Sequence, residues 1–348
     1  MCLYEGTLRN PRFKPNKKNQ GRPPMPKDIR LLRIPKICGH CIECRQDRYN
    51  YWRPRMIEEV RYYQGYKMML LSFDDASIDE IETYLKDKNL PFDANSITHR
   101  AIVLFTKRWE KKYGHKPRHI FITELGPNNT ERVHIHGLMI LEPSMLRPRH
   151  QMKKTIEEVE KIWKYGKVFI GHTTNEKTVN YIAKYILKPD PVHPNFVGDV
   201  RASKGIGKTY LNKWDADQNR FRGEETVETY KTPSGRRIAL PPYYRNKIYN
   251  IDQRETLRLI KEDKETRYMM GHKYEMKTDE QREIFERDRE YFRMENIRKG
   301  YGTNDEKYKK QSYNARGGKI MNNPRIKGKG INDVDKNNPK IKRNDKRA

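Results

Sequence analysis

The chain has 348 residues, with 74 Lys or Arg against 46 Asp or Glu, so its formal net charge is +28 and its pI is about 9.8. Only 34% of the residues are hydrophobic and the mean hydropathy is −1.09, so part of the chain cannot bury enough apolar surface to fold. A chain this basic usually binds a polyanion, and nucleic acid is the default partner, with an anionic membrane as the competing one. Because no apolar run approaches the roughly 20 residues of a membrane span and no signal-peptide pattern follows Met1, we expect a cytoplasmic protein with no membrane partner.

Residues 1–64 are predicted to form a basic N-terminal arm that carries a cysteine cluster. Pro, Lys, Arg and Asn dominate up to residue 36, and the segment CGHCIEC follows. Nested Cys-x2-Cys spacings suit a tetrahedral metal, and cysteines of a cytosolic chain seldom form a disulfide framework. We therefore predict a structural zinc site, with free thiols as the alternative and with His40 as a substitute for one thiolate. Its ligands would be Cys2, Cys38, Cys41 and Cys44.

Residues 65–192 carry alternating strand and helix periodicities that end in one further helix. The order β-α-β-β-α-β predicts an α+β fold of ferredoxin-like (RRM-like) type, with an antiparallel sheet and helices on one face. The predicted strands are 68–73, 119–125, 133–141 and 168–171. The predicted helices are 42–64, 79–88, 97–113, 152–163 and 175–188.

The strand predicted over 133–141 carries the first candidate site. A strand sends alternate side chains to the same face, so His134 and His136 project together while Val133, Ile135, Met139 and Leu141 face the core. Glu124 ends the preceding strand, and a turn-forming loop over 126–130 would bring its carboxylate near both imidazoles. This set suits a divalent cation such as Mg²⁺ or Mn²⁺. Structural or surface histidines are the plainer interpretation of the pair alone.

The helix predicted over 175–188 carries the second candidate site. At about 100° per residue one side is apolar, whereas Tyr181 and Tyr185 fall on the opposite side, one turn apart, beside Lys184. A capping box over 173–176 would start this helix. Two surface tyrosines beside lysines are the ordinary alternative. Lys177 and Lys188 also flank the two tyrosines on this helix.

Tyrosines beside lysines and a metal held by histidines fit a transesterification of DNA. A phenol is a weak nucleophile at neutral pH, and neighbouring cations favour the phenolate. A metal would polarise the scissile phosphate and absorb its developing charge. Attack by Tyr181 or Tyr185 then gives a phosphotyrosine ester and frees a 3′-hydroxyl, without water or ATP. Two tyrosines one turn apart permit a second cleavage while the first strand is still attached.

The remaining chain is predicted to contain no ATPase and no helicase domain. Residues 193–250 form a loop-rich basic extension, 251–299 a charged helical arm with a break near Gly271, and 300–348 a disordered basic tail. The segment GIGKT over 205–209 is not a phosphate-binding loop, because that motif requires glycine where Ala202 stands. We expect no bound ATP, so strand separation would need a partner.

Several segments resemble known proteins. ERVHIHG is similar to the metal motif of HUH endonucleases, and YIAKY followed by ILK is similar to the two-tyrosine helix of their replication initiators. The MCLY start, CGHCIEC, NEKTVNYIAKYILK, ASKGIGKTY and LPPYYRNKIY resemble the replication initiation proteins of gokushoviruses (Microviridae), from residue 1 to about residue 260. In some HUH proteins a glutamate of the preceding strand is the third metal ligand, and Glu124 occupies the matching place.

This resemblance implies a rolling-circle replication initiator of a single-stranded DNA phage. Such a protein nicks and joins the viral strand at the origin through a 5′-phosphotyrosine intermediate, with a host helicase and DNA polymerase, in the cytoplasm of the bacterial host. Two alternatives remain open. One is a relaxase or transposase of the same chemistry, and the other is a non-enzymatic zinc-containing nucleic-acid-binding protein whose tyrosines stack on bases.

Overall fold

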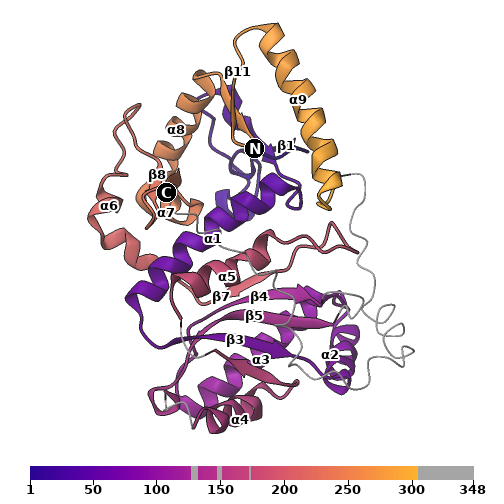
Figure 1. Cartoon of the computed structure of the whole chain (residues 1–348). Helices are drawn as coiled ribbons and strands as arrows, with labels where there is room; N and C mark the ends of the chain where they lie inside the picture. The colour runs from indigo at the N-terminus through magenta and orange to yellow at the C-terminus, as the bar shows by residue number, and fades with distance from the viewer. Residues whose placement is uncertain (127–131, 147–150, 172–173, 305–348) are drawn as a thin grey trace, which may run out of the picture.

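The computed structural model describes residues 1–126, 132–146, 151–171 and 174–304 (Figure 1). Most of the loop predicted over 126–130 and most of the tail predicted over 300–348 lie outside these ranges. None of the helices in the described part of the chain is both long and apolar enough to cross a bilayer. The chain has a mixed α+β fold that is built around one central sheet.

The central sheet is antiparallel and has five strands in the order β6-β3-β5-β4-β7 (Figure 1). The four predicted strands are confirmed as β3 (Tyr66–Ser72), β4 (His119–Leu125), β5 (Val133–Ile140) and β6 (Val168–Ile170). The fifth strand, β7 (Val200–Ala202), was not predicted. It is three residues long and lies between loops, so it has too few alternating positions to give a periodic signal.

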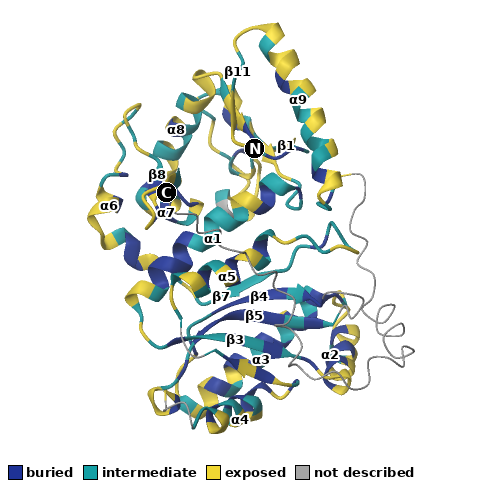
Figure 2. Cartoon of the chain, viewed as in Figure 1, coloured by how far each residue is buried: buried dark blue, intermediate teal, exposed yellow. Residues whose placement is uncertain are grey.

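Helices cover both faces of this sheet, which corrects the prediction of helices on one face. One face packs against α2 (Asp75–Asp87), α3 (Ala94–Tyr113) and α4 (Met152–Trp163). The other face packs against α1 (Ile42–Tyr62) and α5 (Glu176–Leu187), which lie against each other (Figure 1). The central strands carry apolar side chains on both faces of the sheet. Two helical layers are therefore needed to exclude water, and the strands are largely buried (Figure 2).

The second face shows why α1 is needed. Ile120, Ile122 and Leu138 project toward it from β4 and β5 and are fully buried against α1 and α5. Each buried aliphatic side chain stabilises the fold by roughly 1.5–3 kcal/mol relative to an exposed one, so an uncovered face would be strongly destabilising. The helix predicted over 42–64 therefore belongs to the sheet as well as to the N-terminal segment.

The glycine-rich segment over 205–209 packs onto α1 instead of forming a nucleotide-binding loop. The Gly207 amide donates to Glu59 Oε2 at 2.7 Å, and the Tyr244 hydroxyl donates to the Gly207 carbonyl oxygen at 3.0 Å. The other Glu59 oxygen accepts hydrogen bonds from Tyr66 and from Arg118. The Glu59 carboxylate thus accepts the hydrogen bond of the Gly207 amide, which a nucleotide phosphate would otherwise have to accept.

The segment after β7 forms a compact aromatic layer rather than loops alone. Tyr210, Tyr230 and Tyr244 are buried together with Leu240 and Leu257. The elements here are η6 (Lys208–Asn212), α6 (Trp214–Asp217), β8 (Thr229–Lys231), β9 (Arg237–Ala239), α7 (Pro242–Ile248) and α8 (Ile251–Asp263). The break expected near Gly271 is a hairpin of β10 (Thr266–Met269) and β11 (His272–Glu275), followed by α9 (Asp279–Arg298).

The N-terminal segment and α9 meet at one end of the molecule (Figure 1). Phe285 of α9 and Met269 of β10 are buried against Leu3 and the cysteines. Asn296, which is 1% exposed, accepts from the amide of Ile42 at the start of α1. The charged helix α9 therefore buries part of its surface against the N-terminal segment. The N-terminal elements are β1 (Gly6–Arg9), η1 (Pro11–Phe13), η2 (Lys17–Asn19), η3 (Ile29–Leu32) and β2 (Arg33–Lys36), and η4 (Pro143–Met145) follows β5.

Candidate active site

The register of β4 and β5 brings Glu124, His134 and His136 together. Glu124 pairs with His134 across the two strands, and Ile122 pairs with His136. Glu124 Oε2 lies 3.0 Å from His134 Nε2 and 2.8 Å from His136 Nε2. One ligand atom from each residue lies within 4.8 Å of the others, as a shared cation requires. The structure thus assembles the predicted metal set, while the role of these residues as ligands stays a prediction.

The second nitrogen of one imidazole is already engaged. His134 Nδ1 lies 3.0 Å from the backbone oxygen of Arg132, so Nδ1 carries the proton and donates it. Nε2 is the nitrogen that faces the Glu124 carboxylate, at 3.0 Å. This carbonyl–imidazole contact is a common way in which proteins fix the tautomer of a metal-binding histidine. A carboxylate oxygen and two imidazole nitrogens fit a divalent cation.

The electrostatics of the set keep Glu124 ionised. Burial alone would raise the pKa of this carboxyl, but hydrogen bonds from His134, His136 and Lys188 outweigh that effect and hold the pKa well below its usual range. Burial lowers the pKa of His136, which favours its neutral form. An ionised carboxylate and a neutral imidazole are the forms that bind metals.

Helix α5 places the two tyrosines over this set. Its N-terminus is fixed by a capping box of Asn175 and Thr178, which corrects the box predicted over 173–176; residue 173 lies outside the described part of the chain. The Tyr185 ring stacks on the His136 imidazole, with 3.8 Å between centroids and 12° between planes. The Tyr185 hydroxyl donates to the Tyr181 hydroxyl at 2.7 Å, and Tyr181 is 45% exposed. The predicted nucleophiles therefore lie at the predicted metal site.

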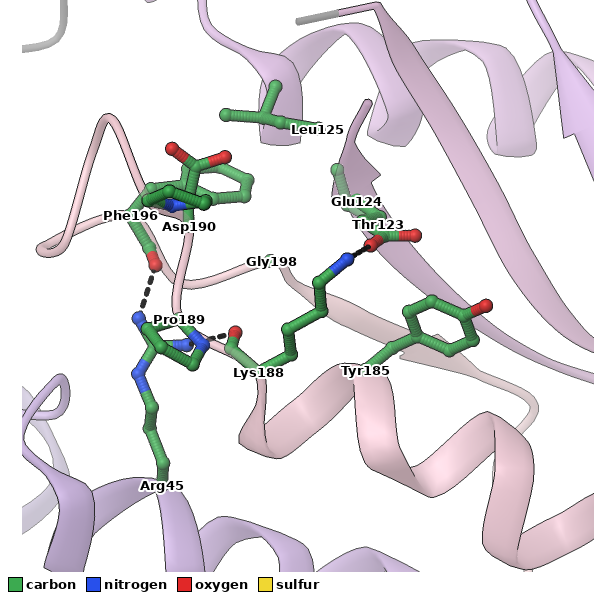
Figure 3. A pocket seen from close by; sticks show the side chains of 11 residues that line it. Arg45, Thr123, Glu124, Leu125, Tyr185, Lys188, Pro189, Asp190, Phe196 and Gly198 are labelled. Carbon is green, nitrogen blue, oxygen red and sulfur yellow. Dashed lines mark hydrogen bonds and ion pairs between the residues drawn. The ribbon is translucent and has the colours of Figure 1, made fainter. Parts of the chain in front are cut away.

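For Tyr185 the surroundings oppose the phenolate that the flanking lysines were expected to favour. Burial, the hydrogen bond to Tyr181 and the nearby Glu124 charge raise the pKa of Tyr185 above its usual value. Lys184, predicted to be catalytic, is exposed. Instead Lys188 Nζ binds Glu124 Oε1 at 2.7 Å (Figure 3). Positions 181, 184, 185 and 188 follow helical spacing on one face, so the sequence placed both lysines beside the tyrosines, and only the position of Glu124 selects Lys188.

Arg45 is a second residue of the site region that the sequence did not reveal. Its side chain is 2% exposed and donates to the backbone oxygens of His40, Lys188, Pro194 and Phe196, two of which Figure 3 shows. Burial without an acidic hydrogen-bond partner lowers the pKa of Arg45 to about 10. The guanidinium caps the C-terminal end of α5 and fixes the loop behind Glu124, where a cavity of about 40 Å³ lies. Its acceptors are far apart in sequence, so no motif marks them.

The four cysteines converge at the end of the molecule where the N-terminal segment meets α9. Their Sγ atoms all lie within 4.8 Å of one another, and Cys38 Sγ and Cys44 Sγ are 3.8 Å apart. Thiolates at about 2.3 Å from a tetrahedral zinc would be about 3.8 Å from each other, so the donor set fits that ion. The convergence of all four sulfurs favours the all-cysteine set over the alternative with His40. The cysteines are candidate metal ligands and no disulfide links them.

A family model described as replication-associated protein ORF2 matches residues 83–190. The matched region runs from α2 past the end of α5, so it contains Glu124, both histidines and both tyrosines. It indicates a protein of DNA replication and is consistent with a rolling-circle replication initiator. No curated protein and no solved structure gives a significant match to this chain.

Proposed function

We propose that this protein is a rolling-circle replication initiator of the HUH endonuclease type, which nicks and joins single-stranded DNA through a tyrosine ester. The observation that carries the proposal is the stacking of Tyr185 on His136, one ligand of the candidate metal set. The match to the replication-associated family over residues 83–190 supports it independently. So does the chain order β3, α2–α3, β4, β5, α4, β6, which is the β-α-β-β-α-β order of ferredoxin-like folds.

The chemistry assigned to this chain is a phosphoryl transfer to a phenol. The Oη atom of Tyr181 or Tyr185 loses its proton and bonds to phosphorus while the bond from phosphorus to O3′ breaks. The leaving oxygen takes up a proton, and the 5′-phosphate stays on the protein. A divalent cation held by Glu124, His134 and His136 would polarise the phosphate and stabilise the charge that develops on it.

The hydrogen bond between the two phenols suggests how the tyrosines share the work. The Tyr185 hydroxyl donates a hydrogen bond to Tyr181 Oη, so the two phenolic oxygens lie next to each other. Attack by one phenol leaves the other beside the same phosphate-binding region, where it can accept the second strand when a circle is closed. The 3′-hydroxyl freed by the second cleavage attacks the first ester and closes the circle, so no energy source is consumed.

The biological setting that we propose follows from this chemistry and from the sequence resemblance. The substrate is the origin of a single-stranded DNA phage of the gokushovirus group, in the cytoplasm of a bacterial host. Because the chain carries no recognisable ATP-binding motif, a host helicase would separate the strands and a host DNA polymerase would extend the free 3′-end.

Covalent capture of DNA tests the proposed function. The protein is incubated with Mn²⁺ and a library of random-sequence single strands labelled at the 3′-end, which is the end that stays on the protein. Boiling in detergent then removes all DNA that is not covalently bound. We expect a labelled adduct that depends on the metal and maps to α5. An adduct on any other segment, or none at all, would contradict the proposal and favour a non-enzymatic nucleic-acid-binding protein.

Tyrosine variants sharpen this test. Tyr→Phe removes the nucleophile and keeps the ring, so packing on His136 should survive. Each single variant, Tyr181→Phe or Tyr185→Phe, should still nick a captured sequence but fail to release closed circles, and the double variant should form no adduct. Tyr268→Phe is the matched control, because Tyr268 is 60% exposed and lies on β10, away from the site. An adduct of normal yield with the double variant would exclude these residues.

A further inference from the structure

A groove of about 590 Å³ lies between α2, α3 and β7, outside the candidate active site. This volume falls within the roughly 300–1,000 Å³ of pockets that take small organic ligands. It opens beside β7, one of the two edge strands of the sheet. Neither the metal set nor the tyrosines use it, because Glu124 and His134 project from the opposite face of the sheet, the face on which α5 carries Tyr185.

The groove combines an apolar wall with cationic groups. Leu85, Leu90 and Val103 form part of the wall, and Arg100 and Arg201 lie among the polar groups. The Arg100 guanidinium lies 3.5 Å from the centroid of the Tyr84 ring, which holds it in place without a carboxylate. A flat heterocycle beside an anion would be complementary to such a lining.

The acidic groups of the groove are already engaged. Asp199 pairs with Arg201, and Asp93 caps α3 by accepting from the Ser96 amide at 2.9 Å. By contrast, Arg201 Nε is buried with no hydrogen-bond partner within the described ranges, although Nη2 of the same guanidinium pairs with Asp199. A buried donor of this kind costs free energy unless a ligand satisfies it. The groove therefore offers donors to an incoming anion.

The groove is also within reach of the candidate active site. The Thr123 amide donates to the Asp199 carbonyl oxygen at 3.0 Å, and Thr123 directly precedes Glu124. Gly198 lines the cavity beside Glu124 and Lys188, and Asp199 lines the groove. The backbone of positions 198 and 199 therefore joins the cavity beside Glu124 to the groove, next to the start of β7.

We propose that this groove binds one nucleotide of the single strand whose scissile phosphate lies at the candidate active site. The base packs against Leu85, Leu90 and Val103, and its phosphate binds Arg100 and Arg201. The strand would then turn around the edge of the sheet at β7 as it leaves the site. This inference rests on the proposed function, because it takes single-stranded DNA as the substrate.

Equilibrium binding tests the inference without requiring any cleavage. Fluorescein-labelled 12-nucleotide single strands of random sequence are titrated with the full chain and followed by fluorescence anisotropy. We expect Arg201→Gln and Arg100→Gln each to weaken binding about 10-fold, because each loses a phosphate contact in a partly enclosed site. Lys107→Gln is the matched control: it removes one positive charge from an exposed position of α3 that does not line the groove, and it should change binding less than about 2-fold.

A map of contacts keeps the test decisive if a variant folds poorly. Single strands that contain photoreactive 4-thiothymidine are crosslinked to the unmodified chain, and we expect labelled peptides from residues 84–103. Unlabelled dTMP at the same nucleotide concentration should not compete, because the groove holds one nucleotide of a strand and not a free nucleotide. Effective competition by dTMP, the absence of crosslinks in that region, or equal losses for Arg201→Gln and Lys107→Gln would each overturn the inference.

The two proposals fail separately. Normal covalent adducts with unchanged binding of the groove variants would remove the groove and leave the tyrosine chemistry in place. Weakened binding of the groove variants with no adduct from any strand would remove the chemistry. In that case the groove would still be a single-strand binding site.

Discussion

Glu124 divides its two carboxylate oxygens between two kinds of partner. Oε2 faces both imidazoles, and Oε1 binds Lys188 of α5. The carboxylate thus links the sheet that carries the histidines to the helix that carries the tyrosines. A cation that takes Oε2 would leave the ion pair with Lys188 intact, so the spacing between metal set and nucleophile is fixed before DNA arrives.

Loss of one imidazole should separate chemistry from DNA binding. We expect His134→Ala or His136→Ala to lower the yield of the covalent DNA adduct at least about 100-fold, because outer and inner metal ligands have effects of this size or larger. Affinity for single strands should change less than about 2-fold, since it comes from many distributed cations. The exposed His272→Ala serves as the control. Full adduct yield from His134→Ala in Mg²⁺ or Mn²⁺ would contradict the metal assignment.

His119 gives a pH dependence of stability that is independent of the site. Burial lowers its pKa below the ordinary value of 6.5, and its Nδ1 lies 3.0 Å from the Pro117 carbonyl oxygen. Below pH 6.5 the unfolded chain therefore binds a proton that the folded chain does not. As the pH is lowered through that window, the free energy of unfolding decreases, by at most about 1.4 kcal/mol per pH unit.

A non-titrating variant isolates this contribution. His119→Gln should be less stable than the wild type at pH 7.5, and the difference between the two should shrink as the pH is lowered to 5.5. Urea unfolding followed by circular dichroism at both pH values measures it. A constant difference between the two proteins would mean that His119 titrates normally in the folded chain.

At the scale of elements, α1 joins the sheet to the C-terminal aromatic layer. Its buried Glu59 binds the Gly207 amide, and its buried Glu58 binds the Tyr230 hydroxyl at 2.8 Å and Lys213. Two adjacent carboxylates thus hold residues that are about 150 positions away in sequence. Each is stabilising only because its partners neutralise or hydrogen-bond it. The helix would expose unpaired buried charge if the 205–209 segment moved.

The two glycines of that segment provide a matched pair of variants. Both have positive φ, +77° at Gly205 and +72° at Gly207. A Cβ at Gly205 would meet only the Lys208 side chain at 3.5 Å, whereas at Gly207 it would lie 2.7 Å from the Arg55 carbonyl oxygen. Gly205→Ala should therefore cost about 1–2 kcal/mol of unfolding free energy, and Gly207→Ala about 2 kcal/mol more. Equal losses in urea unfolding would show that this segment does not pack tightly on α1.

At the scale of the whole molecule, the cysteine cluster ties the two ends of the described chain together. Cys2 comes from the N-terminal segment and the other three cysteines flank or begin α1, while Phe285 and Met269 pack against them from the C-terminal side. The cluster is therefore a joint between the N-terminal segment, α1 and α9. Such a small apolar cluster alone is a weak joint, and a bound metal would stabilise it strongly.

We predict one structural zinc per chain at this joint. Elemental analysis of protein purified without chelator should give one zinc, and Cys44→Ser should lose it. Removal of zinc should speed hydrogen exchange in residues 1–36 and α9, and it should leave β3 and β5 protected, because the sheet has its own core. Zinc-free wild-type protein, or exchange that rises equally in the sheet, would contradict this prediction.

The sequence by itself determined the elements of the core and the grouping of the candidate site. Period-two alternation placed His134 and His136 on one face, and helical spacing placed Tyr181 opposite the apolar stripe. Both signals are local, because they depend only on the geometry of one strand or one helix. The position of Glu124 needed only the pairing of two strands that are neighbours in sequence.

The tertiary structure decided what distant segments do to one another. The second helical layer, the strand β7, the clamp of Arg45 and the packing of α9 all depend on contacts between segments far apart in sequence, for which periodicity carries no information. The choice of Lys188 over Lys184 was also tertiary, because both lysines lie on the same helix and only the position of Glu124 distinguishes them. Local sequence determines which face a side chain takes, but burial and charge pairing depend on what packs against that face.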